Sequence, residues 1–140
     1  MPQSIREVMT PNPVTVPQSA PLTEAAKAMR ESDIGDVVVI DDSGKVFGLV
    51  TDRDIVIRAL ADGRDPNQTP VGEIATKDLV AIPSDSAVER AISLMREKAV
   101  RRIVVVDDDQ PVGIVSIGDL AIERDSDSAL ADISKADPDR

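Results

Sequence analysis

Two short segments of the chain each place a hydroxyl side chain three residues before a carboxylate. Thr51 precedes Asp54, and Ser116 precedes Asp119. A hydroxyl hydrogen can donate to a phosphate oxygen, and a carboxylate can accept from both hydroxyls of a ribose. These pairs therefore have the chemistry to hold a sugar phosphate. The same spacing also fits a capping box, in which the two side chains only satisfy the first amides of a helix.

The surroundings of both pairs follow one plan. A glycine is followed by an apolar strand end, the hydroxyl residue, two spacers, the aspartate and an apolar helix, in residues 48–56 and again in residues 113–120. This junction puts the polar side chains at the carboxyl end of a strand, where ligands bind in many α/β folds. A helix that begins there offers free N–H groups and the positive end of its dipole to a phosphate.

The rest of the chain is an internal repeat, because residues 8–44 align with residues 74–110 without a gap. Such a repeat takes precedence over local patterns when the architecture is predicted. The identical positions include Thr10 and Thr76, Val14 and Val80, Pro17 and Pro83, Ala25 and Ala91, Met29 and Met95, and Asp41 and Asp107.

Four segments follow from this alignment. We expect one repeat over residues 3–63, a linker over 64–69, a second repeat over 70–124 and an acidic C-terminal tail over 125–140. The tail is short of apolar residues, which predicts either a frayed end or a loose helix over 129–135.

Each repeat predicts a short helix, a brief strand, an amphipathic helix, a buried strand, a second strand joined by a hairpin, and a final helix. In the first repeat these elements cover Ile5–Met9, Val14–Val16, a helix opened by Pro21, Val37–Ile40, Val46–Val50 and a helix from Asp52 to about Asp62. In the second repeat they cover Val71–Ala75, Leu79–Ile82, a helix after Ser86, Ile103–Val106, Val112–Val115 and a helix from about Ile117.

Residue types set the ends and the buried faces of these elements. Ser4, Thr69 and Ser86 with Glu89 are expected helix caps, and Gly63 is expected to end the last helix of the first repeat. The β-branched runs are expected to be buried on both faces of a sheet. The expected apolar helix faces are Leu22, Ala25, Ala26 and Met29, and Val88, Ala91, Ile92 and Met95.

The composition excludes several kinds of chemistry. The chain has no Cys and no His, which excludes disulfides, thiolate and imidazole metal sites, and Ser-His-Asp triads. No nucleophile–base pair and no glycine-rich phosphate loop is visible, so we do not expect an enzyme. The run Asp107-Asp108-Asp109 lacks the ligand spacing of a Ca²⁺ loop and is predicted to be a solvated turn, so no metal is expected.

Charge and hydropathy point to a protein that binds neither nucleic acid nor membrane. The net charge is −10 and Phe47 is the only aromatic residue, whereas nucleic-acid surfaces need basic stripes and stacking rings. No apolar run approaches the length of a membrane span, and residues 1–10 do not form a signal peptide. We therefore expect a cytoplasmic location.

The doubled pattern resembles the CBS domain, and two copies in tandem resemble a CBS pair, or Bateman module. The resemblance covers residues 3–124, with Val38 and Val104 standing where the family often has proline. The segments that carry it are residues 34–42 with 48–54, and residues 100–108 with 113–119.

This resemblance implies an α/β (α+β) fold of two β-α-β-β-α repeats related by pseudo-two-fold symmetry. It implies a regulatory or sensor module that binds an adenosine-containing nucleotide (AMP, ADP, ATP or S-adenosylmethionine) in clefts between the repeats. Such modules commonly form flat homodimers and signal to an effector protein, and this chain is similar to stand-alone bacterial CBS-pair proteins. No cofactor is required, since the nucleotide is a regulatory ligand. The alternative is a ligand-free module for dimerisation or protein interaction.

The resemblance also assigns roles to residues. It implies that Thr51 and Ser116 donate to phosphate and that Asp54 and Asp119 accept from ribose. The residues expected to surround the base, which otherwise serve as core and edge of a β-layer, are Thr10, Val14, Thr15, Val37, Val38, Thr76, Leu79, Ala81, Ile103 and Val104.

Cations suited to a phosphate are few in this acidic chain. Arg53 lies inside the first junction, where the second junction has Ile117, and Arg101 and Arg102 precede a buried strand. Arginine suits phosphate because its guanidinium presents a fork of donors. The alternative for each of these arginines is a surface side chain that is solvated or paired with a carboxylate. From Arg53, we expect the first junction to be the better one for a charged ligand.

Overall fold

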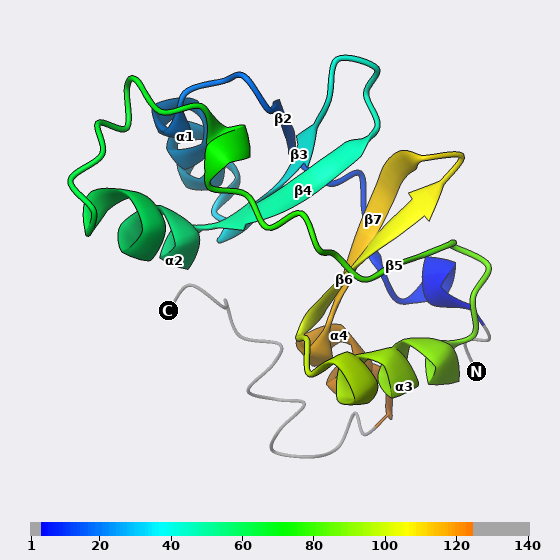
Figure 1. Ribbon diagram of the computed structural model, residues 1–140. Helices are drawn as coiled ribbons and strands as arrows, with labels where there is room; N and C mark the ends of the chain where they lie inside the picture. Colours follow the sequence, from blue (N-terminus) through cyan, green and yellow to red (C-terminus); the bar gives the residue numbers. More distant parts are fainter. Residues whose placement is uncertain (1–3, 125–140) are drawn as a thin grey trace. The chain divides into compact units, whose positions relative to one another are not determined.

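The computed structural model describes residues 4–124, and these residues form two compact units. One unit consists of residues 14–79, and the other joins residues 4–13 to residues 80–124. Each unit combines a small sheet with helices (Figure 1), so the mixed α/β class predicted from the sequence is confirmed. Within the described residues, no helix is both long enough and apolar enough to span a bilayer.

The unit of residues 14–79 is built on a three-stranded sheet in the order β2-β3-β4. β2 (Thr15–Pro17) runs parallel to β3 (Asp36–Ile40), and β3 runs antiparallel to β4 (Val46–Thr51). Helix α1 (Leu22–Ser32) supplies the crossover that two parallel strands require.

Helical turns follow the last strand of this unit. α2 (Asp52–Asp54) begins directly after β4 and continues into the π-helix η2 (Ile55–Leu60). Gly63 has a φ of 74°, and its N–H donates to the Leu60 carbonyl at 3.0 Å, so the predicted glycine stop is confirmed. The 3-10 helix η3 (Val71–Glu73) closes the unit.

β3 forms the centre of the core in this unit. Val37, Val38 and Val39 have no exposed surface, as expected for a strand covered on both faces. The predicted apolar face of α1 is right at three positions, but Ala26 is exposed. The buried residues of this core are Val16, Leu22, Ala25, Met29, Val37, Val39, Val50, Ile55, Ala59, Val71, Ile74 and Ala75.

The other unit has a four-stranded sheet in the order β1-β7-β6-β5. β5 (Ala81–Ile82) runs parallel to β6 (Arg102–Asp107), and β6 runs antiparallel to β7 (Gln110–Ser116). β1 (Thr10–Pro11) adds to the free edge of β7 in antiparallel direction. The β5-β6-β7 part thus repeats the arrangement β2-β3-β4.

Three helices accompany this second sheet. α3 (Val88–Lys98) connects β5 to β6, α4 (Ile117–Arg124) follows β7, and the 3-10 helix η1 (Ile5–Glu7) precedes β1. The buried residues of the core are Ile5, Ile82, Val88, Ala91, Leu94, Met95, Ile103, Val105, Val115 and Leu120.

The opening segment of each sequence repeat belongs to the unit built by the other repeat. The Ile5 N–H donates to the Ser86 carbonyl at 2.8 Å, which ties η1 to the second repeat. The Val71 N–H donates to the Ala20 carbonyl at 2.7 Å, which ties η3 to the first repeat. The compact units therefore differ from the sequence repeats by an exchange of these segments.

Three predicted helix caps are wrong, and each has a physical reason. Ser4 makes no side-chain cap because its backbone pairs with Ala87 in a β-bridge. The Thr69 hydroxyl donates to the Asp65 carbonyl at 2.8 Å instead of accepting from η3. Ser86 stands one residue too early, since Ala87 is the N-cap of α3. The helix considered over 129–135 lies outside the described residues.

Candidate functional site

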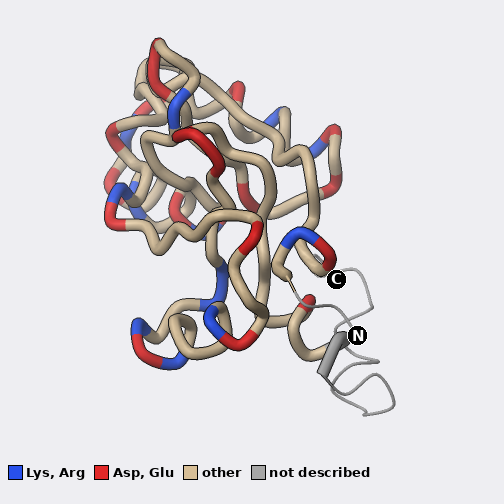
Figure 2. Tube along the Cα trace, turned by 90° about the vertical axis from the view of Figure 1, so that its right-hand side faces the viewer, with Lys and Arg blue, Asp and Glu red and all other residues tan. Residues whose placement is uncertain are grey.

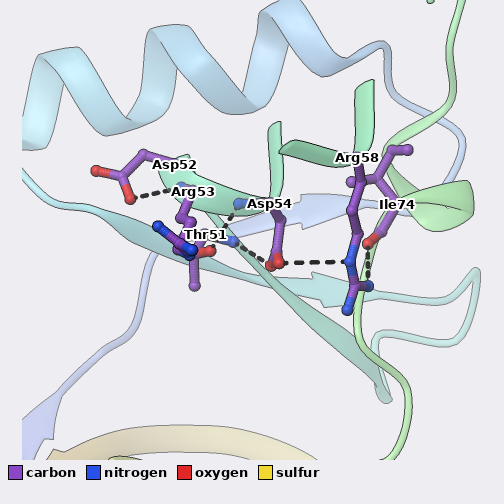
Figure 3. A network of polar contacts seen from close by, with 6 residues as sticks. All are labelled: Thr51, Asp52, Arg53, Asp54, Arg58 and Ile74. Atoms are coloured by element: carbon purple, nitrogen blue, oxygen red, sulfur yellow. Dashed lines mark hydrogen bonds and ion pairs between the residues drawn. The ribbon is translucent and has the colours of Figure 1, made fainter. Parts of the chain in front are cut away.

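At the end of β4, Thr51 and Asp54 hold each other by two reciprocal hydrogen bonds (Figure 3). The Thr51 N–H donates to Asp54 Oδ2 at 2.9 Å, and the Asp54 N–H donates to Thr51 Oγ1 at 3.0 Å. Thr51 has extended backbone and is the N-cap of the turn that Asp52 begins. The capping box that this spacing allows is therefore formed, and both residues are half-buried.

The second junction has the same geometry at the end of β7. The Ser116 N–H donates to Asp119 Oδ2 at 2.9 Å, and the Asp119 N–H donates to Ser116 Oγ at 3.2 Å. Ser116 and Asp119 are also half-buried. The sequence correctly indicated that one strand-to-helix junction occurs twice.

An arginine that the sequence reasoning missed contacts the first junction. Arg58 Nε lies 3.7 Å from Asp54 Oδ1, and Arg58 Nη1 donates to the Ile74 carbonyl at 3.1 Å (Figure 3). Arg58 thus connects the junction carboxylate to the segment that follows η3. The spacing of four residues on a helix was the available signal.

The residues across the ladder from the two hydroxyls have opposite charge. Asp36 of β3 is the register partner of Thr51, and Arg102 of β6 is the register partner of Ser116. Sequence reasoning did not single out Asp36, because its position opposite Thr51 depends on the register of the hairpin.

A model of the CBS domain family matches residues 5–60 and residues 71–125. The chain belongs to the CBS domain family. Each copy of the CBS domain contains one of the two junctions. Together the two copies cover most of the sequence. The tandem CBS pair predicted from the doubled pattern is confirmed.

Relatives of similar size are themselves CBS proteins. The chain is 38% identical over 135 residues to the CBS domain-containing protein YhcV of Bacillus subtilis. The aligned region covers 94% of this chain and 95% of that protein. It is 37% identical over 116 residues to hypoxic response protein 1 of Mycobacterium tuberculosis. That aligned region covers 83% of this chain and 81% of that protein.

Solved structures show the same CBS fold. A crystal structure of hypoxic response protein I with two coordinated zinc ions superposes with a TM-score of 0.75 at 36% identity, covering 84% of this chain and 96% of that one. A hexameric CBS-CP12 protein from bloom-forming cyanobacteria superposes with a TM-score of 0.77 at 31% identity, covering 89% and 70%.

The described part of this chain shows no candidate metal site, although hypoxic response protein I was solved with zinc. Among residues 4–124, no group of three or more Asp and Glu side chains is placed to hold a metal ion, and the chain has no His and no Cys. Asp107, in the acidic run considered for Ca²⁺, accepts from Ser84 through both carboxylate oxygens.

In the unit of residues 14–79, several residues predicted to surround a base lie at β2 and β3, in the sheet whose strand β4 leads to the first junction. Thr15 pairs with Val38, whose N–H donates to the Val14 carbonyl at 2.9 Å. Val37 pairs with Val50, the residue before Thr51. Val14 is half-buried and Thr15 is exposed, whereas Val37 and Val38 are core residues.

The other CBS unit arranges its residues in the same way. Ala81 pairs with Val104, and Ile103 pairs with Val115, the residue before Ser116. Ala81 is exposed, whereas Ile103 and Val104 are buried.

Other predicted site residues lie apart from these positions. Thr76 pairs with Leu49 on the opposite side of β4 from β3, and Thr10 pairs with Ile114 on the opposite side of β7 from β6. Leu79 is the last residue of the unit of residues 14–79 and is half-buried. The arginines Arg53, Arg101 and Arg102 are all exposed.

Proposed function

We propose that this CBS pair is a non-catalytic regulatory module that binds an adenosine-containing nucleotide at its strand-to-helix junctions. The observation that carries the proposal is the repeated pair of reciprocal hydrogen bonds, Thr51 with Asp54 and Ser116 with Asp119. Two junctions with one geometry present the same hydroxyl and carboxylate chemistry twice, as the CBS family implies.

The capping box and ligand binding are chemically compatible. In accepting from the Asp54 N–H, the Thr51 hydroxyl uses a lone pair, and its hydrogen remains to donate to a phosphate oxygen. Asp54 accepts the Thr51 N–H on Oδ2, and Oδ1, which lies 3.7 Å from Arg58 Nε, keeps lone pairs for a ribose hydroxyl. The hydrogen bonds that fix both side chains also reduce the conformational entropy that a ligand must remove.

The base would lie against the β2-β3 edge in one unit and the β5-β6 edge in the other. Val14 is half-buried and Thr15 and Ala81 are exposed, so these residues would offer surface to a base at the two edges. The buried strand residues Val38 and Val104 would form the apolar floor beneath the base.

Signalling requires a difference in affinity. A nucleotide shifts the CBS pair between two states only as far as it binds one state more tightly than the other. We propose that the module works as a homodimer in the cytoplasm and that an effector protein responds to its altered conformation or dimer geometry.

Calorimetric titration of AMP, ADP, ATP and S-adenosylmethionine into the full chain tests this function. A ligand at 100 times its Kd should stabilise the fold by about 2.7 kcal/mol, seen as a rise in melting temperature. Asp54→Ala and Asp119→Ala should each remove one binding event, whereas Asp52→Ala, which changes an exposed neighbouring carboxylate, should not. A flat titration with all four ligands would overturn the proposal.

One observation favours the alternative, a ligand-free module for dimerisation or protein interaction. Val56, Ile57 and Leu60 on η2 are 54%, 45% and 51% exposed, which is unusual for large apolar side chains on one short helix. Leu60→Glu should lower the mass measured by light scattering if this surface forms a dimer. An unchanged nucleotide response in the same variant would separate the two functions.

A further inference from the structure

An apolar groove lies between helices α3 and α4, in the unit that joins residues 4–13 to residues 80–124. The two helices pack beside each other (Figure 1), and the groove between them has a volume of about 310 Å³. This volume is at the small end of ligand pockets, so it suits a few apolar side chains. The residues that line it are Ile92, Met95, Arg96, Val100, Ile117, Leu120 and Ala121.

Both helices form their wall of the groove with the same spacing. Residues 92, 95 and 96 of α3 stand at i, i+3 and i+4, as do residues 117, 120 and 121 of α4, which places each set on one face of its helix. Met95 and Leu120 are buried at 7% and 4% exposure, whereas Ile117 is 55% exposed. A third helix with an apolar face of this spacing would complete the packing.

The equivalent helix pair of the first repeat is less apolar. In the repeat alignment Ala26 stands at the position of Ile92, and Asp52 stands at the position of Ile117. A contiguous apolar surface on a folded protein usually marks a site of interaction. This surplus of apolar side chains occurs in the repeat from which the C-terminal segment continues, since α4 ends at Arg124.

Residues 125–140 have the sequence pattern that the groove requires of an occupant. Residues 125–128, Asp-Ser-Asp-Ser, favour a turn, and antiparallel helices are joined by loops of about 2–5 residues. Residues 129–136 then match the eight residues of α4 in length. Their apolar side chains follow at helical spacing and are Ala129, Leu130, Ile133 and Ala136.

The charge of the segment also fits the groove. Five aspartates against Lys135 and Arg140 give residues 125–140 a formal charge of −3, and the charged side chain that lines the groove is the guanidinium of Arg96. Asp132 is at the border of the apolar face, where it can meet this cation. Because Arg96 is exposed, such a pair would contribute little, and the apolar contact would dominate.

We propose that residues 129–136 form an amphipathic helix that lies antiparallel to α4 and covers this groove, with Leu130 and Ile133 as its anchors. The peptide link to α4 keeps the segment at a high effective concentration beside the groove. A second copy of the chain lacks this advantage and would bring a net charge of −10 to the same surface. The apolar face of the second repeat is thus closed by its own chain.

Disulfide trapping tests the docking, because the chain has no Cys of its own. In the antiparallel arrangement, Ala121→Cys and Ile133→Cys bring two thiols together, and a disulfide needs Cα atoms about 4.4–6.8 Å apart. Under mild oxidation this pair should close within one chain about tenfold faster than Arg90→Cys with Ile133→Cys, because docking raises the effective concentration. Arg90 is an exposed residue of α3 that does not line the groove.

Variants confined to the C-terminal segment give a second measurement. Ile133→Asp should uncover the groove and raise the fluorescence of anilinonaphthalene sulfonate, a dye that reports exposed apolar surface. Ser134→Asp adds the same charge at the next position, outside the apolar face, and should leave the fluorescence unchanged. These variants decide the proposal if Ala121→Cys prevents folding.

Three results would overturn the proposal. Equal closing rates of the two thiol pairs would show that the segment does not prefer the groove. A disulfide formed mainly between two chains would assign the groove to a second copy. A dye signal that rises equally in Ile133→Asp and Ser134→Asp, or in neither, would show that the segment does not cover the groove. None of these results depends on nucleotide binding.

Discussion

The buried Ser84 hydroxyl donates to Asp107 Oδ2 at 2.6 Å, while the Ser84 N–H donates to Asp107 Oδ1 at 3.0 Å. The same hydroxyl accepts from Arg6 Nη2 at 2.6 Å, and the Arg6 N–H donates to the Ser84 carbonyl at 3.0 Å. Ser84 thus joins the start of the chain to the end of β6. These contacts hold the exchanged segment in its unit.

We expect Ser84→Ala to destabilise the fold by about 1–3 kcal/mol. The change removes the hydroxyl that donates to Asp107 Oδ2 and accepts from Arg6, although the Ser84 N–H remains. Chemical denaturation at neutral pH measures this loss. Ser93→Ala, at an exposed position of α3, should stay within about 0.5 kcal/mol of the unmodified chain. Equal effects of the two changes would contradict the role of Ser84.

Acid should weaken the fold partly through Asp107. The side-chain and backbone hydrogen bonds from Ser84, aided by the charge of Arg6, hold the pKa of Asp107 below its ordinary value. A carboxyl whose pKa is lower in the folded state stabilises the fold above its unfolded pKa of about 3.9, and this contribution is lost as the pH falls through the folded pKa.

Asp107→Asn should therefore flatten the fall of stability below about pH 4, relative to the unmodified chain. Urea midpoints measured from neutral to acidic pH for both proteins check this. Asp108→Asn, at an exposed neighbouring position, should keep the original slope. A parallel slope in the Asp107 variant would show that other carboxylates account for acid sensitivity.

Gly48 and Gly113 are equivalent glycines whose nearest neighbours differ. A Cβ at Gly48 would lie 2.7 Å from the Thr76 carbonyl oxygen, which is backbone. A Cβ at Gly113 would collide first with Met9 Sδ, the far part of a flexible side chain, and would lie 3.0 Å from the Thr10 carbonyl oxygen. We expect Gly48→Ala to cost roughly 2–3 kcal/mol and Gly113→Ala about 1 kcal/mol.

Thermal unfolding ranks these two glycine variants. Hydrogen exchange at the Leu49 amide, which donates to the Thr76 carbonyl at 3.0 Å, should quicken in Gly48→Ala. The reverse order of stability would show that the backbone near Thr76 moves more easily than the Met9 side chain.

Thr51 should stabilise the fold even without nucleotide. Thr51→Ala removes the cap of the turn after β4 and should cost about 1 kcal/mol, while Thr51→Ser should retain most of that stability. Denaturation without added ligand measures both variants. No loss in Thr51→Ala would show that the hydrogen bond to the Asp54 N–H contributes nothing.

Much of the fold follows from local patterns. The buried runs around Val38 and Val104, the hairpins and the glycine stop at Gly63 were predictable because apolar periodicity and turn chemistry act within a few residues. The distribution of Lys and Arg among Asp and Glu along the described trace (Figure 2) also follows directly from the sequence.

Other features depend on contacts between distant residues. The β-bridge of Ser4 with Ala87 replaces the cap that Ser4 could form, and no local pattern indicates it. At the site, the hydroxyl–carboxylate pairs were readable, but Asp36 and Arg102 acquire their position through strand register. Arg53 was singled out only because it is adjacent to the first junction in the sequence, and its side chain is exposed.

The exchanged opening segments make the two repeats mutually dependent. A polypeptide of residues 1–69 would carry η1 and β1 without the sheet that β1 joins, and would lack residues 70–79, which complete the unit of residues 14–79. The complementary fragment would be unfinished in the same way, so the two should restore each other only when mixed. In the history of this gene, neither copy of the repeat could then be deleted without leaving the surviving copy incomplete.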